Sequence, residues 1–267
     1  MDTPVNAALE TARRPVLSAE HLTVKVGERT LVSDLSMQLA PGEFVAILGR
    51  NGSGKTLTLH TLAGLRAPAG GTVCLDGTSL AHMSRRAIAR QSGFLAQDLE
   101  EGFVTTAMES VLIGRHPHLS LWEWESDEDE RVAHRALAAV DMEKLGERLT
   151  DTLSGGERRR VAIASLLAQD PAAFLLDEPT NHLDPHHQLV VLSLFRELAR
   201  AGRTVVATLH DPTLAARFAD RALLLSGDGK WTAGPVEQEI TAARLSELYV
   251  TPILEIRQDG RRVFVPA

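Results

Sequence analysis

The sequence predicts an α/β fold with a mostly parallel β-sheet, and three observations lead to that prediction. The apolar run Glu43–Leu48 is continuous rather than alternating, which is typical of a strand buried on both faces of a parallel sheet. A second apolar run, AAFLLDE, has the same character and ends in Asp177 and Glu178. A glycine-rich bend, Gly49–Thr56, follows the first run, and a helix should follow the bend. With 267 residues, 44% of them hydrophobic, the chain can bury such a sheet in one large domain or two small ones.

The charge balance and the cysteine content exclude several classes of protein. A formal net charge of -7 argues against a sequence-independent nucleic-acid binder, which needs a basic surface to displace counterions from phosphates. A local basic patch is still compatible with this balance. Cys74 is the single cysteine and has no metal-type spacing around it, so we interpret it as a small buried residue of a reducing compartment.

No stretch of the chain approaches the roughly 20 apolar residues that a membrane-spanning helix needs. The first residues include Arg13 and Arg14, without the apolar core of a signal peptide on either side of them. We therefore expect a flexible N-terminal tail over residues 1–16 and a cytoplasmic protein.

The bend Gly49–Thr56 has the form G-x-x-x-x-G-K-[ST], in which backbone N–H groups and the N-terminus of the following helix surround an anion. Lys55 would reach the β- and γ-phosphates of a nucleotide, and Thr56 would offer its hydroxyl to Mg²⁺. A chance glycine-rich turn is the alternative, and the strand-turn-helix context disfavours it. The residues expected to bind the nucleotide here are Gly49, Arg50, Asn51, Gly52, Ser53, Gly54, Lys55, Thr56 and Thr58.

Two adjacent acids end the second apolar run. Because neighbouring side chains on a strand diverge, Asp177 and Glu178 can serve different atoms. We expect Asp177 to hold Mg²⁺, directly or through water, and Glu178 to act on the attacking water as a general base. Such a base contributes ~10²–10⁴ in rate. The alternative is an exposed acidic strand end without a catalytic role.

A third motif, LSGGERRR, spans Leu153–Arg160. A phosphate-binding bend alone does not make a fast hydrolase, because the transition state of phosphoryl transfer needs further donors. Two glycines before a helix form another anion-accepting terminus, and Ser154 adds a hydroxyl. If this stretch stood alone, an ordinary helix-starting turn would be the preferred interpretation.

Taken in order, the motifs resemble those of the nucleotide-binding subunit of an ABC transporter, and the resemblance extends from about Leu17 to the C-terminus. Its specificity lies in the number of motifs and their order. The matching segments are a Walker A motif (Gly49–Thr56), a Q-loop glutamine (Gln97), the signature (Leu153–Glu157), a Walker B motif (AFLLDE), a D-loop (Asn181–Asp184) and a switch histidine (His210).

The resemblance implies a RecA-like P-loop NTPase core with a mostly parallel sheet, an antiparallel β subdomain and an inserted α-helical subdomain. We expect a discontinuous core over residues 17–97 and 153–267 and a helical signature subdomain over residues 98–152. The insertion is visible at residues 126–130, where a capping serine and four acids favour the start of a helix. We interpret these acids as a solvated helix start rather than a cation site.

In this family two subunits pair head to tail, and each signature closes over the ATP held by the partner's Walker A motif. A chain with one cassette therefore implies a homodimer that seals two ATP molecules. The residues that would act in trans are Leu153, Ser154, Gly155, Gly156 and Glu157. The residues implied in catalysis are Glu178, His210, Gln97 and Lys55, and those implied in binding Mg²⁺ are Thr56, Gln97 and Asp177.

Three of these positions have local structural alternatives. Asp184 and Asp211 each precede a proline, so both suit a helix N-cap with proline at the first helical position. We assign Asp184 both the cap and the D-loop role, and Asp211 mainly the cap. A lone histidine at the end of a strand is usually structural, but its similarity to the switch histidine favours a γ-phosphate contact for His210.

Val26 departs from the family pattern. It stands in LTVKVGER, where the family usually has an aromatic ring that stacks on adenine. Stacking of a base on an aromatic ring is worth about 1–3 kcal/mol, or roughly 5- to 150-fold in affinity. We therefore expect ATP to bind more weakly here than in relatives with the ring.

Several short stretches narrow the resemblance to the ATPases of importers for ferric siderophores, haem and cobalamin. They are the segments GRHP, AQDP and DEPTNHLD and the tail TPIL…VFVP, which should form a hairpin around Asp259-Gly260. The implied partners are a membrane permease, reached through the groove beside Gln97, and indirectly an extracytoplasmic substrate-binding protein. The implied location is peripheral, on the cytoplasmic side of the inner membrane. A soluble ABC ATPase without a transport role is the alternative.

Overall fold

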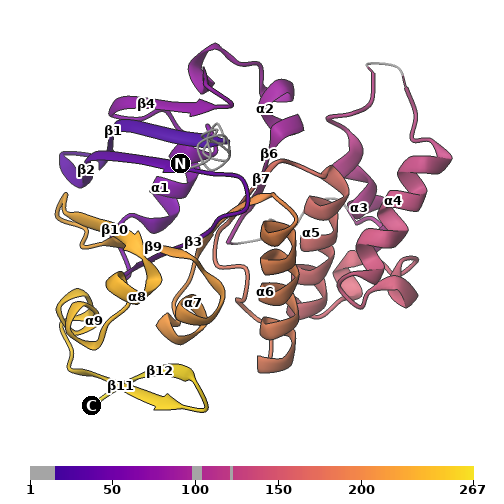
Figure 1. Cartoon of the computed structure of the whole chain (residues 1–267). Coiled ribbons are helices and arrows are strands. Elements are labelled where there is room, and N and C mark those ends of the chain that lie inside the picture. Colours follow the sequence, from indigo (N-terminus) through magenta and orange to yellow (C-terminus); the bar gives the residue numbers. More distant parts are fainter. Residues whose placement is uncertain (1–15, 98–103, 121–122) are drawn as a thin grey trace, which may run out of the picture.

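The computed structural model describes residues 16–97, 104–120 and 123–267. Apart from Val16, the expected N-terminal tail lies outside the described residues. The described chain forms a six-stranded sheet, a four-stranded sheet and a two-stranded C-terminal hairpin, with helices packed between and beside them (Figure 1). This arrangement confirms the predicted fold class.

The six-stranded sheet has the order β10-β9-β3-β8-β7-β6. Neighbouring strands from β9 to β6 are parallel, and β10 pairs antiparallel with β9. Strands β3, β7 and β8 are buried over their whole length, as their continuous apolar runs predict. The bounds are β3 (Phe44–Gly49), β6 (Ser92–Leu95), β7 (Ala173–Leu176), β8 (Thr204–Thr208), β9 (Arg221–Leu225) and β10 (Trp231–Pro235).

The four-stranded sheet is antiparallel and has the order β2-β1-β4-β5. Helix α1 (Lys55–Leu62) joins it to the larger sheet, because Leu59 and Leu62 share one apolar core with Leu22 of β1 and Ile47 of β3. The bounds are β1 (Leu17–Val26), β2 (Arg29–Leu39), β4 (Gly70–Leu75) and β5 (Thr78–Ser79).

Strand β3 separates two apolar cores, since its successive side chains point to opposite faces. Val45 and Ile47 pack in the core that contains α1. Ala46 and Leu48 pack in the second core, which also contains the inner faces of α5, α6 and α7. The end of β3 is therefore held between two packed layers of helix and sheet.

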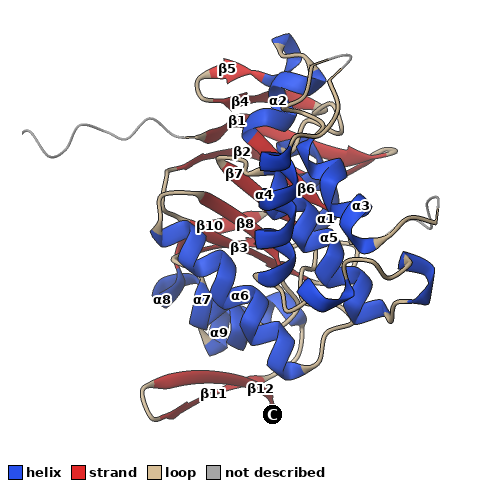
Figure 2. Cartoon of the chain, turned by 90° about the vertical axis from the view of Figure 1, so that its right-hand side faces the viewer, coloured by secondary structure: helices blue, strands red, loops and turns tan. Residues whose placement is uncertain are grey.

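A helical region projects to one side of the sheet (Figures 1 and 2). Helices α3 and α4 pack on α5, and α5 also contacts β6. The helices are α1 (Lys55–Leu62), α2 (Arg85–Gln91), α3 (Ala107–Leu112), α4 (Asp127–Ala138), α5 (Gly155–Gln169), α6 (Pro185–Arg200), α7 (Pro212–Phe218), α8 (Val236–Glu239) and α9 (Ala242–Tyr249). Short 3-10 turns span Leu80–His82, Ile113–Arg115, Glu143–Leu145 and Thr150–Thr152.

The predicted helix caps are confirmed. Asp184 caps α6 by accepting a hydrogen bond from the His187 N–H at 2.9 Å, with proline at the first helical position. Asp211 caps α7 by accepting from the Thr213 N–H at 2.7 Å. Ser126 caps α4 in a capping box with Asp129. Each cap satisfies backbone donors that the first helical turn leaves without partners.

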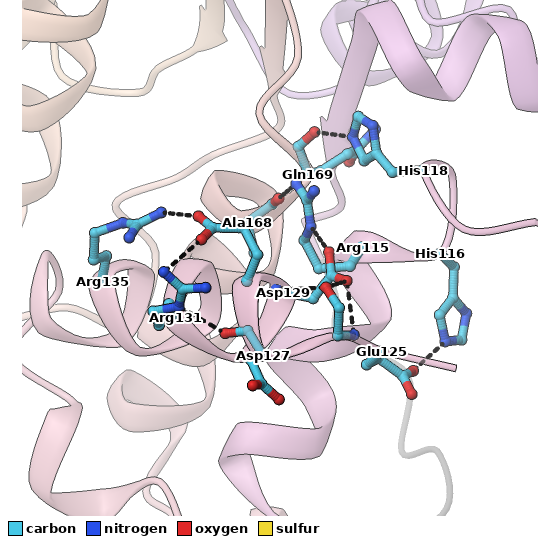
Figure 3. Close-up of polar contacts among 12 residues, drawn as sticks. Arg115, His116, His118, Glu125, Asp127, Asp129, Arg131, Arg135, Ala168 and Gln169 are labelled. Carbon is cyan, nitrogen blue, oxygen red and sulfur yellow. Dashed lines mark hydrogen bonds and ion pairs between the residues drawn. The ribbon is translucent and has the colours of Figure 1, made fainter. Parts of the chain in front are cut away.

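The acids at the start of α4 are not all solvated, and here the prediction was wrong for Asp129. Asp129 is only 6% exposed. Arg115, in the preceding 3-10 turn, donates from Nε to Asp129 Oδ1 at 2.8 Å and compensates for the buried charge (Figure 3). The Ser126 hydroxyl donates to the other carboxylate oxygen at 2.7 Å. The Ser126 hydroxyl, followed by Arg115, lowers the pKa of this carboxyl to about 2. A cation supplied by a neighbouring turn allowed an acid to be buried where composition alone indicated a solvated one.

The C-terminal hairpin consists of β11 (Ile253–Gln258) and β12 (Arg261–Pro266). Asp259 and Gly260 both have positive φ, 51° and 74°, as a two-residue hairpin turn that matches the strand twist requires. The predicted hairpin and its turn are therefore confirmed. Within the described ranges, no helix combines the length and apolar character needed to cross a bilayer.

Candidate nucleotide site at the strand ends

The glycine-rich bend connects the end of β3 to the start of α1. Gly52 and Gly54 have φ of 75° and 100°, in the region that L side chains rarely adopt. A Cβ atom at Gly54 would lie 3.0 Å from the Leu31 side chain, so close packing also excludes a larger residue there. The bend thus turns sharply into the N-terminus of α1, where unpaired backbone N–H groups favour a bound anion.

Lys55 starts α1 and lies within the bend. Its ammonium donates to the carbonyl oxygen of Gly49 at 2.9 Å and lies 3.4 Å from that of Arg50. Lys55 is only 6% exposed, and its burial lowers the pKa, while Glu178 and Asp177 act in the opposite direction. The ammonium is therefore held close to both acids and to the mouth of the bend, where a phosphate group would add further negative charge.

Asp177 follows β7 and is almost fully buried, at 1% exposure. Thr208, at the end of the neighbouring strand β8, donates its hydroxyl to Asp177 Oδ1 at 2.6 Å. The other oxygen, Oδ2, is buried and has no hydrogen-bond partner among the described residues. The bond from Thr208 thus orients the carboxylate through one oxygen, and the other oxygen is left unpaired within the described chain.

Glu178 points elsewhere, as neighbouring strand residues do. His210 Nε2 lies 2.5 Å from Oε1, and Asn181 Nδ2 donates to Oε2. The Glu178 N–H donates to the Thr208 hydroxyl at 2.8 Å. The backbone of Glu178 has φ of 48°, a left-handed conformation that costs a non-glycine residue about 1–3 kcal/mol. Such strain persists only where surrounding contacts hold it.

A cavity of about 480 Å³ brings residues from these segments together. It contains five of the expected positions from the bend, together with Val26, Gln97, Glu178 and His210. Its described lining is Val26, Arg29, Leu31, Asn51, Gly52, Gly54, Lys55, Thr56, Leu57, Gln97, Glu178 and His210. A larger cavity of about 830 Å³ lies between β10 and α9, but of the expected site residues its described lining includes Arg50 alone.

Thr58 is not brought to this cavity. It is fully buried on α1, and its hydroxyl has no hydrogen-bond partner among the described residues, whereas the adjacent Leu57 lines the cavity. Gly49 and Ser53 support the bend from inside, because a Cβ atom at Gly49 would lie 2.4 Å from the Ser53 hydroxyl. Ser53 is itself buried, at 2% exposure.

The donors at this site fit Mg²⁺ only together with a ligand. Thr56 and Gln97 line the cavity, whereas Asp177 is not among its described lining residues and contributes a buried oxygen without a partner. The Thr56 hydroxyl, the Gln97 amide oxygen and that carboxylate oxygen are of the hard oxygen type that Mg²⁺ prefers. In the described part of the chain, no group of three or more His, Cys, Asp or Glu side chains could hold a metal ion. Mg²⁺ usually binds through one or two carboxylates plus phosphate oxygens and water, which matches a single spare carboxylate oxygen beside a phosphate-binding bend.

The signature segment lies outside this cavity. None of Leu153–Glu157 is among the described residues that line it. Ser154 caps α5 by accepting from the Glu157 N–H, and Glu157 accepts from the Ser154 N–H in return. A Cβ atom at Gly156 would lie 3.1 Å from the carbonyl oxygen of His182, so the signature packs against the D-loop. Its glycines allow this close backbone approach.

Sequence reasoning missed several residues that support the site. Thr208 bonds both strand-end acids, and Arg29 donates to the carbonyl oxygen of Gly227 beside the bend at 2.8 Å. Arg159 of α5 is 1% exposed and contacts the strand ends. A signal for it existed, because Arg159 precedes the buried Ile163 and Leu166 by four and seven positions on one face of the helix.

The chain is similar to known ATP-binding proteins in sequence and in fold. The ABC transporter family model matches residues 32–181. The chain is 41% identical to the ferric enterobactin transport ATP-binding protein FepC of Escherichia coli (strain K12) over 232 residues, covering 86% of this chain and 85% of that one. It is 42% identical to the hemin import ATP-binding protein HmuV of Nocardia farcinica over 225 residues, covering 84% and 77%.

Longer and structural matches extend the likeness. The petrobactin import ATP-binding protein FpuD of Bacillus anthracis is 35% identical over 260 residues, covering 92% of this chain and 95% of that one. A metal-chelate type ABC transporter solved in an inward-facing conformation superposes with a TM-score of 0.82 at 29% identity, covering 95% and 98%. The dimeric ATP-binding cassette MJ0796, bound to ADP and phosphate, superposes with a TM-score of 0.73 at 27% identity, covering 82% and 98%.

Proposed function

The chain belongs to the ABC transporter family, and from that premise we propose that it is the ATP-hydrolysing subunit of an importer for a ferric siderophore or haem. Two copies bind two ATP molecules between them and drive a separate membrane permease. The observation that carries this proposal is that Lys55, Gln97, Glu178 and His210 line one cavity. The cargo rests on the relatives, whose names state ferric enterobactin, hemin and petrobactin.

We assign roles to these residues as follows. The N–H groups of the bend and the Lys55 ammonium bind the phosphates of ATP and neutralise their charge. Glu178 accepts the proton of the attacking water on a carboxylate oxygen, and His210 and Asn181 hold that carboxylate in place. Gln97 orients the same water from the end of β6. When bound at Thr56 and Asp177, Mg²⁺ supplies further neutralisation of the developing charge.

The second half of each site comes from a second copy. In this chain the signature caps its own helix and lies outside the Walker A cavity, so it is free to serve another nucleotide. A head-to-tail pair places Ser154 and Gly156 of one copy over the ATP bound by the other. The structure of a relative, the MJ0796 cassette, is a dimer with bound ADP and phosphate. ATP binding and dimerisation are therefore linked in our proposal.

A groove beside Gln97 suits the permease. It has a volume of about 600 Å³ and is lined mostly by apolar residues of β6, α5 and the turn after α3. Ala96, next to Gln97, lines it on the core side, and Ile113, which is 52% exposed, lines it on the helical side. We propose that a short cytoplasmic helix of the permease lies here with its apolar face inward. The protein then binds peripherally to the cytoplasmic face of the membrane.

The experiment that tests this function is purification of the tagged protein from detergent-solubilised membranes of its source, with identification of the bound proteins. A polytopic permease should copurify with the unmodified protein. Ile113→Glu should abolish that copurification while ATP binding is retained. Leu65→Glu is the matched control, because Leu65 is similarly exposed, at 53%, but lies outside the groove. A protein that hydrolyses ATP but binds no permease would favour a soluble, non-transport ATPase instead.

A further inference from the structure

Arg159 is a fully buried arginine, at 1% exposure, in the second turn of the signature helix α5. Its guanidinium group points away from solvent and toward the carboxyl ends of two parallel strands. Arginine carries five N–H donors in a planar fork and does not lose its charge in proteins. The backbone carbonyl oxygens that accept from it belong to Ala96, Gln97, Asp177, Glu178 and Pro179.

These carbonyl groups lie where the ladder between β6 and β7 ends. The bond from the Asp177 N–H to the Leu95 carbonyl, at 2.9 Å, continues the pairing just past the strands. Beyond it, the two segments carry Gln97 and Glu178 toward the nucleotide cavity. The guanidinium group donates to carbonyl oxygens of both segments. It therefore links the two segments beyond the point where backbone pairing between β6 and β7 ends.

The contacts at Glu178 are specific to its conformation. One terminal nitrogen of Arg159 donates to the carbonyl of Asp177 at 2.6 Å and to that of Glu178 at 2.7 Å. These carbonyls belong to the two peptide units on either side of the Glu178 Cα atom, so together they restrain its φ and ψ. Glu178 has φ of 48°, which its own side chain does not favour. Arg159 thus restrains the strained backbone that aims the carboxylate.

We propose that Arg159 is a positioning residue for hydrolysis: it fixes the positions of Glu178 and Gln97 relative to each other and to the signature helix. This inference rests on the proposed function. Ser154 caps the same helix, so a rigid link runs from the signature segment to Glu178, the proposed general base of the same chain. Arg159 contacts the backbone of these residues rather than the nucleotide, so its loss affects the chemical step more than binding.

Arg160 provides a matched control. It is the next residue on α5, carries the same side chain, and also donates to two backbone carbonyls, those of Val140 at 3.2 Å and Asp141 at 3.3 Å. Those carbonyls follow α4 in the helical region and lie outside the nucleotide cavity. A general effect of losing an arginine from α5 should appear in both variants, and an effect on positioning should appear only at Arg159.

The test compares Arg159→Met, Arg159→Lys and Arg160→Met with the unmodified protein in steady-state phosphate release over a range of ATP concentrations. Arg159→Met should lower kcat about 10- to 100-fold, since a misplacement of about 1 Å can cost 10²-fold, with KM and the equilibrium affinity for ATP within about twofold. Arg159→Lys should recover part of kcat, because its ammonium can still bond some of the carbonyls. Arg160→Met should keep kcat within about twofold.

A double variant gives the second measurement. In a Glu178→Gln background the base is already absent, so Arg159→Lys should lower the residual rate far less than it does in the unmodified background. Equal losses in the two backgrounds would overturn the inference. Thermal unfolding of each variant identifies those that fold, and Arg159→Lys carries the test if Arg159→Met does not fold.

The outcomes separate this inference from the function on which it rests. An unmodified protein without phosphate release would overturn both. An active unmodified protein whose folded Arg159 variants have unchanged kcat would overturn the inference alone, and so would variants that lose ATP affinity while keeping kcat. A loss of kcat at Arg159, with unchanged affinity and an unaffected Arg160 variant, supports it.

Discussion

Two buried acidic clusters in this chain are built from similar side chains and differ in one respect. In the helical region, both carboxylate oxygens of Asp129 are occupied, one by Arg115 and the other by Ser126 (Figure 3). At the strand ends, Asp177 keeps one buried oxygen without a partner among the described residues, and Glu178 lies beside a half-exposed histidine. The first cluster is fully hydrogen-bonded within the chain, and the second leaves one buried oxygen unpaired.

This difference teaches how a structural acid can be distinguished from a functional one. Asp129 and Glu178 are both buried, and each lies beside a basic side chain, Arg115 and His210 respectively. Burial and nearby charge therefore do not distinguish the two clusters. Unsatisfied buried polar atoms are rare in folded proteins, so each calls for an explanation. In our proposal, substrate and metal account for the free carboxylate oxygen of Asp177, whereas the fully bonded carboxylate of Asp129 needs no ligand.

The largest expected effect breaks the strand-end cluster at its base. Glu178→Gln should lower steady-state phosphate release about 10²- to 10⁴-fold, because the amide cannot accept the proton of the attacking water. ATP binding should be retained, since the bend and Lys55 are unchanged. With ATP and Mg²⁺ the variant should form a dimer, measured by size-exclusion chromatography with light scattering. A variant that stays monomeric under these conditions would contradict the half-site scheme.

The comparison extends to the rim of the nucleotide cavity, where Val26 is 48% exposed and lines the opening. This apolar side chain is half-exposed, whereas the unpaired carboxylate oxygen of Asp177 is buried. Val26→Tyr should bind ATP roughly 5- to 150-fold more tightly, because an aromatic ring can stack on adenine. Titration calorimetry of the two proteins measures the change, and equal affinities would show that the base does not lie over residue 26.

The structural cluster should respond in stability rather than in rate. Asp129→Asn removes a carboxylate bonded to Arg115 and Ser126, which should lower the free energy of unfolding by about 2 kcal/mol. Urea unfolding measures this loss. The kcat of the folded variant should stay within about twofold of the unmodified value. A large fall in kcat without a loss of stability would indicate that Asp129 contributes to hydrolysis and not to folding.

The acid dependence of stability follows from the same residue. The pKa of Asp129 is lowered from 3.8 to about 2 in the folded protein, so its contribution is present above pH 4 and is lost as the pH falls toward 2. Asp129→Asn should therefore flatten the decrease in unfolding free energy between about pH 4 and pH 2. Urea unfolding at several pH values measures the two slopes, and parallel slopes would contradict the assignment.

The smallest effect is expected at Asp211, an acid adjacent to the catalytic candidate His210. Its carboxylate caps α7, so Asp211→Ala should cost about 1 kcal/mol of stability. The kcat should change little, because the cap is directed at the helix and not at the cavity. Thermal unfolding and phosphate release on one preparation compare the two effects. A fall in kcat as large as that of Glu178→Gln would contradict the assignment of Asp211 to the cap and would indicate a role in hydrolysis beside His210.

Local sequence rules account for much of the fold. The glycines of the bend, the prolines after Asp184 and Asp211, and Asp259-Gly260 each have a conformational consequence that depends on neighbours in the chain. For that reason the strand-turn-helix unit, the caps and the hairpin turn were predictable. Continuous apolar runs likewise predicted buried parallel strands, since burial on both faces removes the alternation of polar and apolar residues.

The errors and omissions concern residues whose surroundings are set by the packing of the folded chain and not by local spacing. Asp129 was expected in solvent because its charge is visible in the sequence, but Arg115 reaches it from a turn that precedes α4. Thr58 was expected near the nucleotide, yet the rotation of α1 turns it into the core and Leu57 toward the cavity. Thr208 and Arg159 attracted no attention, because their partners lie about 20 to 60 residues away.

The sequence by itself determined the order of motifs, the turn geometries and the chemical types gathered for phosphate and water, because these depend on residue identity and short spacing. Only the tertiary structure decided which carboxylate oxygen is left free, which helix face meets the cavity, and which buried arginine joins the strand ends. These outcomes depend on burial and on hydrogen-bond partners supplied across the fold. Whether a polar group is satisfied is a property of the packed chain as a whole.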